Sequence, residues 1–83
     1  MILCFDIGNT DIYGGVCEGR RLVAEFRKSS SPQPSADEFG VFVLQLLQAR
    51  GVNPSALQAV AAASVVPSFN RILSEACRTY LGL

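Results

Sequence analysis

The chain opens with three short strand-like segments that are joined by turns. Residues 1–7 are apolar and end at Gly8-Asn9-Thr10, and residues 11–18 follow directly. Residues 22–27 alternate after the turn at residues 18–20. Strands joined by such short turns pair antiparallel, because a parallel pair needs a crossover of a dozen or more residues. The sequence therefore predicts an antiparallel three-stranded meander.

The second half predicts two amphipathic helices around one apolar strand. After a loop at residues 29–35, Ser35 and Glu38 have the spacing of a capping box, Gly51 ends the first helix, and residues 53–55 begin the return. The helices carry apolar stripes at Phe39, Phe42, Val43, Leu46 and Leu47, and at Phe69, Ile72, Leu73, Ala76, Cys77 and Tyr80. Residues 57–66 are almost wholly apolar, as in a strand buried on both faces. Pro67 suits the first turn of the second helix.

The order β-β-β-α-β-α predicts an α/β fold with a mixed sheet in the strand order 3-2-1-4. Strand 4 would run parallel to strand 1 through the first helix, so the carboxyl ends of both strands meet at one edge, where such sheets bind ligands. Asp6 and residues 64–66 lie at those ends. Strand 4 would also form an exposed apolar edge, which favours self-association.

Asp6 lies between two apolar residues of the first strand. Burial of an isolated carboxylate costs several kcal/mol unless it is paired, hydrogen-bonded or bound to a metal, so we expect a compensating partner. Asp6 with Gly8, Asn9 and Thr10 could hold a hydrated Mg²⁺ and donate hydrogen bonds to phosphate oxygens. Alternatively, Asp6 accepts hydrogen bonds from its own turn in a plain hairpin.

Composition excludes several other classes of site. Seven basic and seven acidic residues cancel, which argues against nucleic acid or an anionic membrane as the main partner. Without histidine, no catalytic or metal-binding histidine is possible, and three cysteines without a C-x-x-C pair are typical of buried thiols in a reducing compartment. Neither a membrane-spanning run nor a signal peptide is evident, and we expect a cytoplasmic protein. The P-loop and dinucleotide-binding patterns are absent.

Three stretches carry a resemblance to a known family: ILCFDIGNTDIYGGV near the N-terminus, SADEFGVFV at residues 35–43 and AASVVPSF at residues 62–69. Together they resemble the opening of type III pantothenate kinases, in the acetate and sugar kinase, Hsp70 and actin superfamily. The resemblance implies a ribonuclease H-like (actin-like ATPase) subdomain. It also implies ATP-dependent phosphorylation of pantothenate to 4'-phosphopantothenate, the first step of coenzyme A biosynthesis. Mg²⁺, a monovalent cation (K⁺ or NH₄⁺) and a cytoplasmic homodimer are implied as well.

The resemblance also assigns roles to residues. It implies an ATP and phosphate site at Asp6, Ile7, Gly8, Asn9, Thr10, Asp11, Ile12 and Tyr13. Asp6 would act on the magnesium–phosphate side and would not be the general base. Some relatives carry a lysine where this chain has Tyr13, which leaves a charge contact there open. Ser64, Val65, Val66 and Pro67 either line the cleft opposite Asp6 or only lead the strand into the last helix.

We expect residues 1–83 to be the N-terminal part of the first nucleotide-binding subdomain. The resemblance places the general-base aspartate and the pantothenate-binding segment beyond Leu83, so the isolated chain should be inactive. Two alternatives remain: another kinase or phosphatase of the superfamily, or a regulatory relative that keeps the fold without turnover.

Overall fold

The three N-terminal strands are present in a computed structural model that describes residues 1–83. They are β1 (Ile2–Ile7), β2 (Asp11–Glu18) and β3 (Arg21–Ser29), and both neighbouring pairs are antiparallel. β3 is longer than predicted at both ends, because Arg21 pairs with Glu18 across the turn and Ser29 pairs with Asp11. A bulge interrupts the β2–β3 ladder at Val16 and Cys17.

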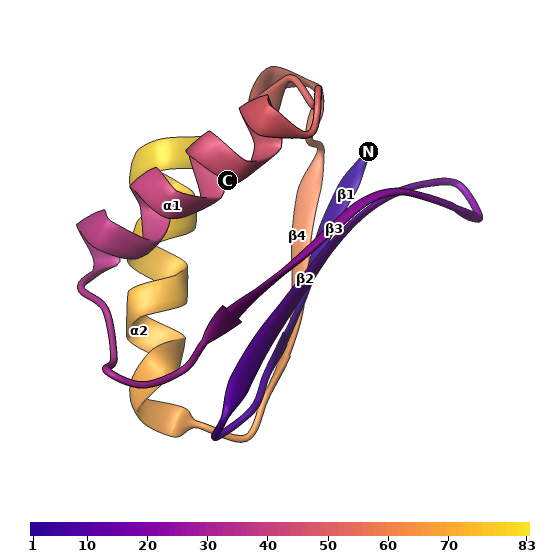
Figure 1. Cartoon of the computed structure of the whole chain (residues 1–83). Coiled ribbons are helices and arrows are strands. Elements are labelled where there is room, and N and C mark those ends of the chain that lie inside the picture. Colours follow the sequence, from indigo (N-terminus) through magenta and orange to yellow (C-terminus); the bar gives the residue numbers. More distant parts are fainter.

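The remaining elements follow the predicted order. They are the helix α1 (Ala36–Ala49), a 3-10 turn η1 (Pro54–Ala56), β4 (Ala59–Ser64), the helix α2 (Pro67–Ala76) and a π-helical turn η2 (Cys77–Leu81). β4 runs parallel to β1, and the sheet order is β3-β2-β1-β4 (Figure 1). The predicted α/β class and strand order are confirmed, and the arrangement is consistent with a ribonuclease H-like subdomain. No helix has the length and apolar character needed to cross a membrane.

α1 begins at the predicted capping box. The hydroxyl of Ser35 accepts a hydrogen bond from the Glu38 N–H at 3.0 Å, and the Glu38 carboxylate accepts one from the Ser35 N–H at 2.9 Å. The bond from the Ser35 N–H to the carboxylate is the main cause that lowers the pKa of Glu38. The helix ends where Gly51 adopts a φ of 75°, a conformation that glycine takes without steric cost.

Both helices cover the same face of the sheet (Figure 1). An aromatic cluster fills the space between the helices and the sheet. Phe39 of α1 is fully buried at the centre of this cluster. Its ring centroid lies 5.5 Å from that of Phe5 and 5.0 Å from that of Phe69, the latter edge-to-face. Phe26 packs edge-on against Phe5 at 6.1 Å. Aromatic pairs at these distances contribute beyond their buried area.

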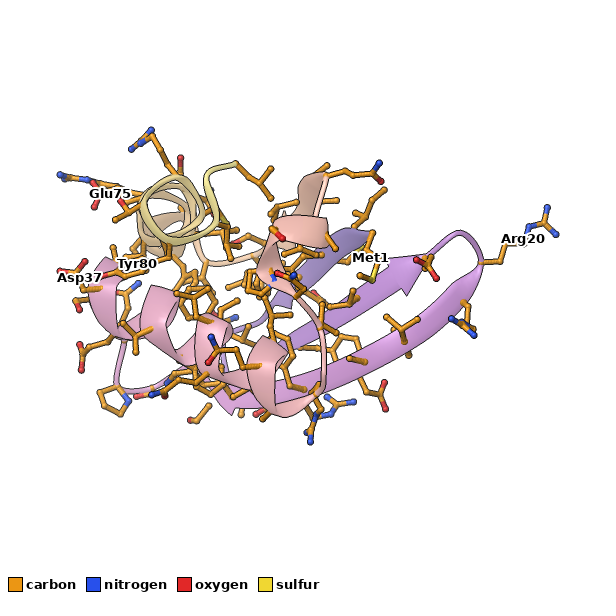
Figure 2. All side chains as sticks on the ribbon, turned by 90° about the horizontal axis from the view of Figure 1, so that it is seen from above. Met1, Arg20, Asp37, Glu75 and Tyr80 are labelled. Carbon is orange, nitrogen blue, oxygen red and sulfur yellow. The ribbon has the colours of Figure 1, made fainter.

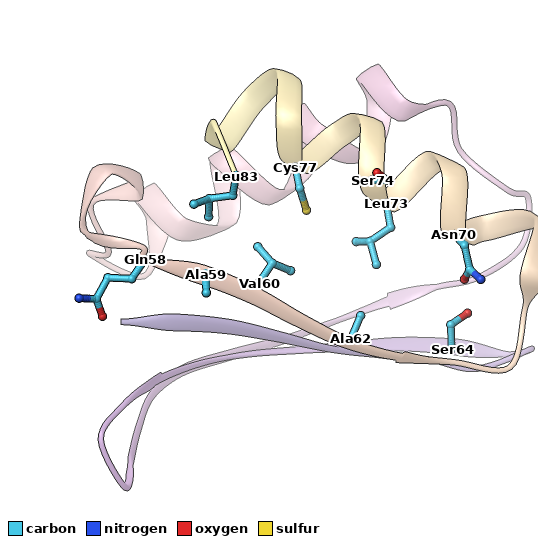
Figure 3. A pocket seen from close by; sticks show the side chains of 10 residues that line it. All are labelled: Gln58, Ala59, Val60, Ala62, Ser64, Asn70, Leu73, Ser74, Cys77 and Leu83. Atoms are coloured by element: carbon cyan, nitrogen blue, oxygen red, sulfur yellow. The ribbon is translucent and has the colours of Figure 1, made fainter.

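The expected burial of β4 on both faces is wrong for this chain. Apart from the half-buried Val60, every β4 residue is exposed, because an open groove separates β4 from α2 on one face and no element covers the other face. β4 pairs only with β1 and forms one edge of the sheet. Its alanines are too short to fill the space beneath α2, where an open groove of about 620 Å³ remains (Figure 3). Leu73 and Cys77 of α2 form part of the groove's opposite wall. The expected exposed apolar edge is therefore present.

The end of the second helix packs against the first through a glycine. The Tyr80 ring lies on Gly40 of α1, and its hydroxyl donates a 2.7 Å hydrogen bond to Asp37 (Figure 2). This hydrogen bond raises the pKa of Tyr80. Phe69 is buried as expected, whereas Tyr80 is only half-buried.

We predict that Gly40→Ala lowers the free energy of unfolding. A Cβ at this position would lie 2.1 Å from a Tyr80 ring carbon, so the ring must move. Overpacking of this kind costs about 1–3 kcal/mol, measurable by urea denaturation. In a Tyr80→Ala background the same substitution should be neutral or stabilising, since alanine favours a helix over glycine by about 1 kcal/mol. An equal loss in both backgrounds would contradict the packing explanation.

Candidate functional site

The β1–β2 turn lies at the carboxyl ends of β1 and β4. Its main chain is closed by a 2.9 Å hydrogen bond from the Gly8 N–H to the Asp11 carbonyl. Ser30, just after β3, holds the turn from outside: its hydroxyl donates to the Gly8 carbonyl at 2.7 Å, and its N–H donates to the Thr10 carbonyl at 2.9 Å. The N–H groups of Asn9 and Thr10 have no main-chain acceptor. Two neighbouring amide donors in a fixed turn are therefore available to a ligand.

Asp6 is exposed to solvent at the end of β1. Because side chains alternate along a strand, Leu3, Phe5 and Ile7 point toward the helices and Asp6 points to the uncovered face of the sheet. Water solvates the carboxylate there, so the compensating partner that was expected for a buried Asp6 is not needed. The turn is closed by main-chain groups rather than by Asp6, which corrects the alternative that Asp6 caps its own turn.

A row of side chains crosses the uncovered face at the level of Asp6. The register places Asp6 opposite Tyr13 of β2 and Ala63 of β4, and Tyr13 opposite Arg27 of β3. The Arg27 guanidinium carbon lies 4.8 Å from the centroid of the Tyr13 ring. The Tyr13 hydroxyl donates a hydrogen bond to the Glu25 carboxylate, and this bond raises the pKa of Tyr13.

Sequence reasoning missed Arg27 because its position depends on the β2–β3 bulge. At the turn, Glu18 pairs with Arg21, and an uninterrupted ladder from that pair would place Phe26 opposite Tyr13. The bulge shifts the register by one residue, which turns Phe26 into the core and Arg27 onto the uncovered face. The burial of a phenylalanine at position 26 is the one signal that could have indicated this shift.

The other residues of the expected site lie on both sides of the turn. Ile7 and Ile12 are fully buried and anchor the turn to the core. Asp11 is exposed at the start of β2, and Asn9 lines a cavity of about 210 Å³ that also reaches Ser30 and Gln33. This cavity lies between the turn, the loop after β3 and the start of α2.

Residues 64–67 lead β4 into α2. The Val65 N–H donates to the Ile7 carbonyl at 3.0 Å, so this segment adjoins the turn. The Ser64 hydroxyl accepts a hydrogen bond from the Val66 N–H and donates to its carbonyl, both at 3.1 Å. Ser64 pairs with Ile7, lines the groove beneath α2 and therefore faces away from Asp6. Pro67 opens α2, and Val65 is 67% exposed.

The donor set suits a hydrated metal better than a metal enclosed by protein ligands. No group of three or more His, Cys, Asp or Glu side chains is placed to hold an ion. Mg²⁺ commonly keeps several waters and is held by one or two carboxylates together with substrate phosphates. One exposed carboxylate beside two free amide donors fits this mode of binding.

The comparisons with known proteins all point to one family. A family model described as type III pantothenate kinase matches residues 2–83. A type III pantothenate kinase of Elusimicrobium minutum (strain Pei191) is 46% identical over 83 residues, which is 100% of this chain and 32% of the relative. The Legionella pneumophila (strain Corby) protein of that name is 39% identical over the same shares. That of Myxococcus xanthus (strain DK1622) is 40% identical over 96% of this chain and 31% of its own.

The chain thus spans about a third of the length of these curated relatives.

We predict that Asp6→Asn leaves the melting temperature of the protein almost unchanged. The carboxylate is exposed and the turn is closed by main-chain groups, so the free energy of unfolding should change by less than about 0.5 kcal/mol. Phe5→Ala, one residue away but buried, should cost about 3–5 kcal/mol. A loss of about 1 kcal/mol or more in Asp6→Asn would instead identify Asp6 as a structural cap.

Proposed function

This chain belongs to the type III pantothenate kinase family, and we propose that it supplies part of the ATP-phosphate site of an enzyme that phosphorylates pantothenate to 4'-phosphopantothenate. The observation that carries the proposal is the pairing of a solvent-facing Asp6 carboxylate with a fixed turn whose Asn9 and Thr10 N–H groups are free. The reaction would be the first step of coenzyme A biosynthesis.

The proposed nucleotide site consists of residues 6–13, and different residues of this motif have different roles. Asp6 would hold a water-bound Mg²⁺ on the phosphate side. The Gly8 N–H already donates to the Asp11 carbonyl, so Gly8 would shape the turn. The free N–H groups of Asn9 and Thr10 would donate to phosphate oxygens, because amides in a tight glycine-containing turn form an anion-binding concavity. Ile7 and Ile12 are buried beneath the turn and would keep these donors in place. Gly8 suits this arrangement, since a Cβ there would lie 3.1 Å from the Asp11 carbonyl oxygen.

Such a site contributes to phosphoryl transfer by position and charge. The charge that develops on the transferred group is spread over its oxygens, and donors already in place stabilise it without reorganisation. When bound, Mg²⁺ would neutralise part of that charge. The free amides of the turn would orient the phosphate chain, and Asp6 would act on the magnesium–phosphate side. It would take no proton from pantothenate.

The rest of the activity is proposed to lie outside residues 1–83. We assign these residues to the N-terminal part of the first nucleotide-binding subdomain, and the general base and pantothenate pocket to other sequence. Residues 1–83 alone should lack turnover, because phosphoryl transfer requires both substrates and the metal to be positioned together. Use of K⁺ or NH₄⁺ and a cytoplasmic homodimer rest on the family resemblance, and no ligand in this chain is assigned to the monovalent cation. Residues 64–67 would border the cleft through their backbone.

The proposal predicts that Asp6→Asn in the full-length enzyme lowers kcat/KM by about 10²–10³, the usual cost of one lost electrostatic contact to the transition state. A coupled assay of pantothenate-dependent ADP release measures this effect. Glu18→Gln is the matched control, because it removes an exposed carboxylate at the opposite end of the same sheet. A folded Asp6→Asn enzyme with wild-type kinetics would overturn the phosphate-site assignment.

A further inference from the structure

We propose that Arg27 binds a phosphate oxygen of the same nucleotide as Asp6, and that the Tyr13–Glu25 pair keeps its guanidinium free to do so. This inference rests on the proposed function and adds a residue to its site. Arg27 lies outside the N-terminal motif, on a different strand.

Arg27 lies on the uncovered face of the sheet, the same face as Asp6. Arg27 is exposed and lies two strands from Asp6 in the same row, which places their Cα atoms roughly 10 Å apart. Its guanidinium lies over the Tyr13 ring, which stands between the two strands. A polyphosphate is long enough to contact both side chains. Lys28, the only lysine, lies over the Phe42 ring on the helix-covered face. It therefore cannot contact a phosphate that is bound on the uncovered face.

The guanidinium is free of ion pairs. The structure contains two salt bridges, Arg21 with Glu18 and Arg71 with Glu75, and Arg27 takes part in neither. Glu25 is the acidic neighbour on the same face of β3, but its carboxylate accepts the hydrogen bond of the Tyr13 hydroxyl. Tyr13 therefore supports Arg27 in two ways: its ring stacks on the guanidinium, and its hydroxyl occupies the competing carboxylate.

Charge balance explains why such a residue is needed. Asp6 alone is negative and repels a phosphate, and one Mg²⁺ cancels only part of the charge of a triphosphate. An arginine can donate two parallel hydrogen bonds to a phosphate, and charge-assisted bonds of this kind are stronger than neutral ones. Tyr13 is accordingly a positioning residue, whereas Arg27 contacts the nucleotide.

The first test compares binding of Mg·ATP to the full-length enzyme by isothermal titration calorimetry. Arg27→Gln should weaken binding by about 10- to 100-fold, the range for a hydrogen bond to a charged group, and Arg27→Lys should recover part of the loss. Arg20→Gln is the matched control, because Arg20 projects from the far β2–β3 turn (Figure 2). This variant should bind Mg·ATP with the affinity of the wild-type enzyme. Melting curves confirm that each variant is folded.

The second test addresses Tyr13. Tyr13→Phe keeps the ring but releases Glu25 to pair with Arg27, so Mg·ATP should bind several-fold more weakly. Adding Glu25→Gln should restore the affinity, because the competing charge is then gone. A merely structural role of Tyr13 predicts no such rescue, and its absence would overturn the part of the inference that concerns Tyr13.

The outcomes separate this inference from the proposed function. If Asp6→Asn abolishes turnover while Arg27→Gln binds Mg·ATP normally, the phosphate site stands and Arg27 is not part of it. If Arg27→Gln raises the KM for pantothenate but not that for ATP, the inference is also wrong, because Arg27 then binds the pantothenate carboxylate. If the wild-type enzyme binds no Mg·ATP, the proposed function fails and the inference fails with it.

Discussion

Packing of both helices against one face of the sheet decides where charge can be placed on every strand. The aromatic cluster around Phe39 occupies that face and requires apolar partners from β1 and β3. Alternation then sends each intervening residue to the other face, where no helix lies. Asp6 follows Phe5 and precedes Ile7, so an ionised side chain is solvated between two buried ones. The exposed position of Asp6 therefore follows from a sheet with one covered face and one open face.

On β3, the residues that face the helices are set by the β-bulge as well as by alternation. Leu22 is 48% exposed opposite Cys17, whereas Ala24 and Phe26, at the same spacing along the chain, are buried. A regular strand could not place all three in this way. The bulge inserts one residue between them and reverses the faces of the strand beyond it. The core gains Phe26, and the uncovered face gains Arg27 beside Tyr13.

Local patterns predicted the elements well because they depend on neighbouring residues. The capping box at Ser35, the stripe around Phe39 and the parallel arrangement of β1 and β4 are all present. Burial was less predictable. The alanines of β4 are typical of a doubly covered strand, yet nothing in this chain covers them. Asp6 was expected to need a compensating partner, yet it is exposed to water. Both errors concern which faces are covered, which depends on tertiary packing rather than on the residue's own neighbours.

The turn after β1 is held in place without the side chain of Asp6. Ser30 holds the carbonyls of Gly8 and Thr10 from outside, and the buried Ile7 and Ile12 hold the turn from beneath. The Asp6 carboxylate and the N–H groups of Asn9 and Thr10 contribute nothing to this support. Donors that are already fixed lose little freedom when a ligand arrives, which favours binding of an anion. Because these other atoms hold the turn in place, the motif can keep a solvent-facing negative charge at Asp6, its first residue, without weakening the fold around it.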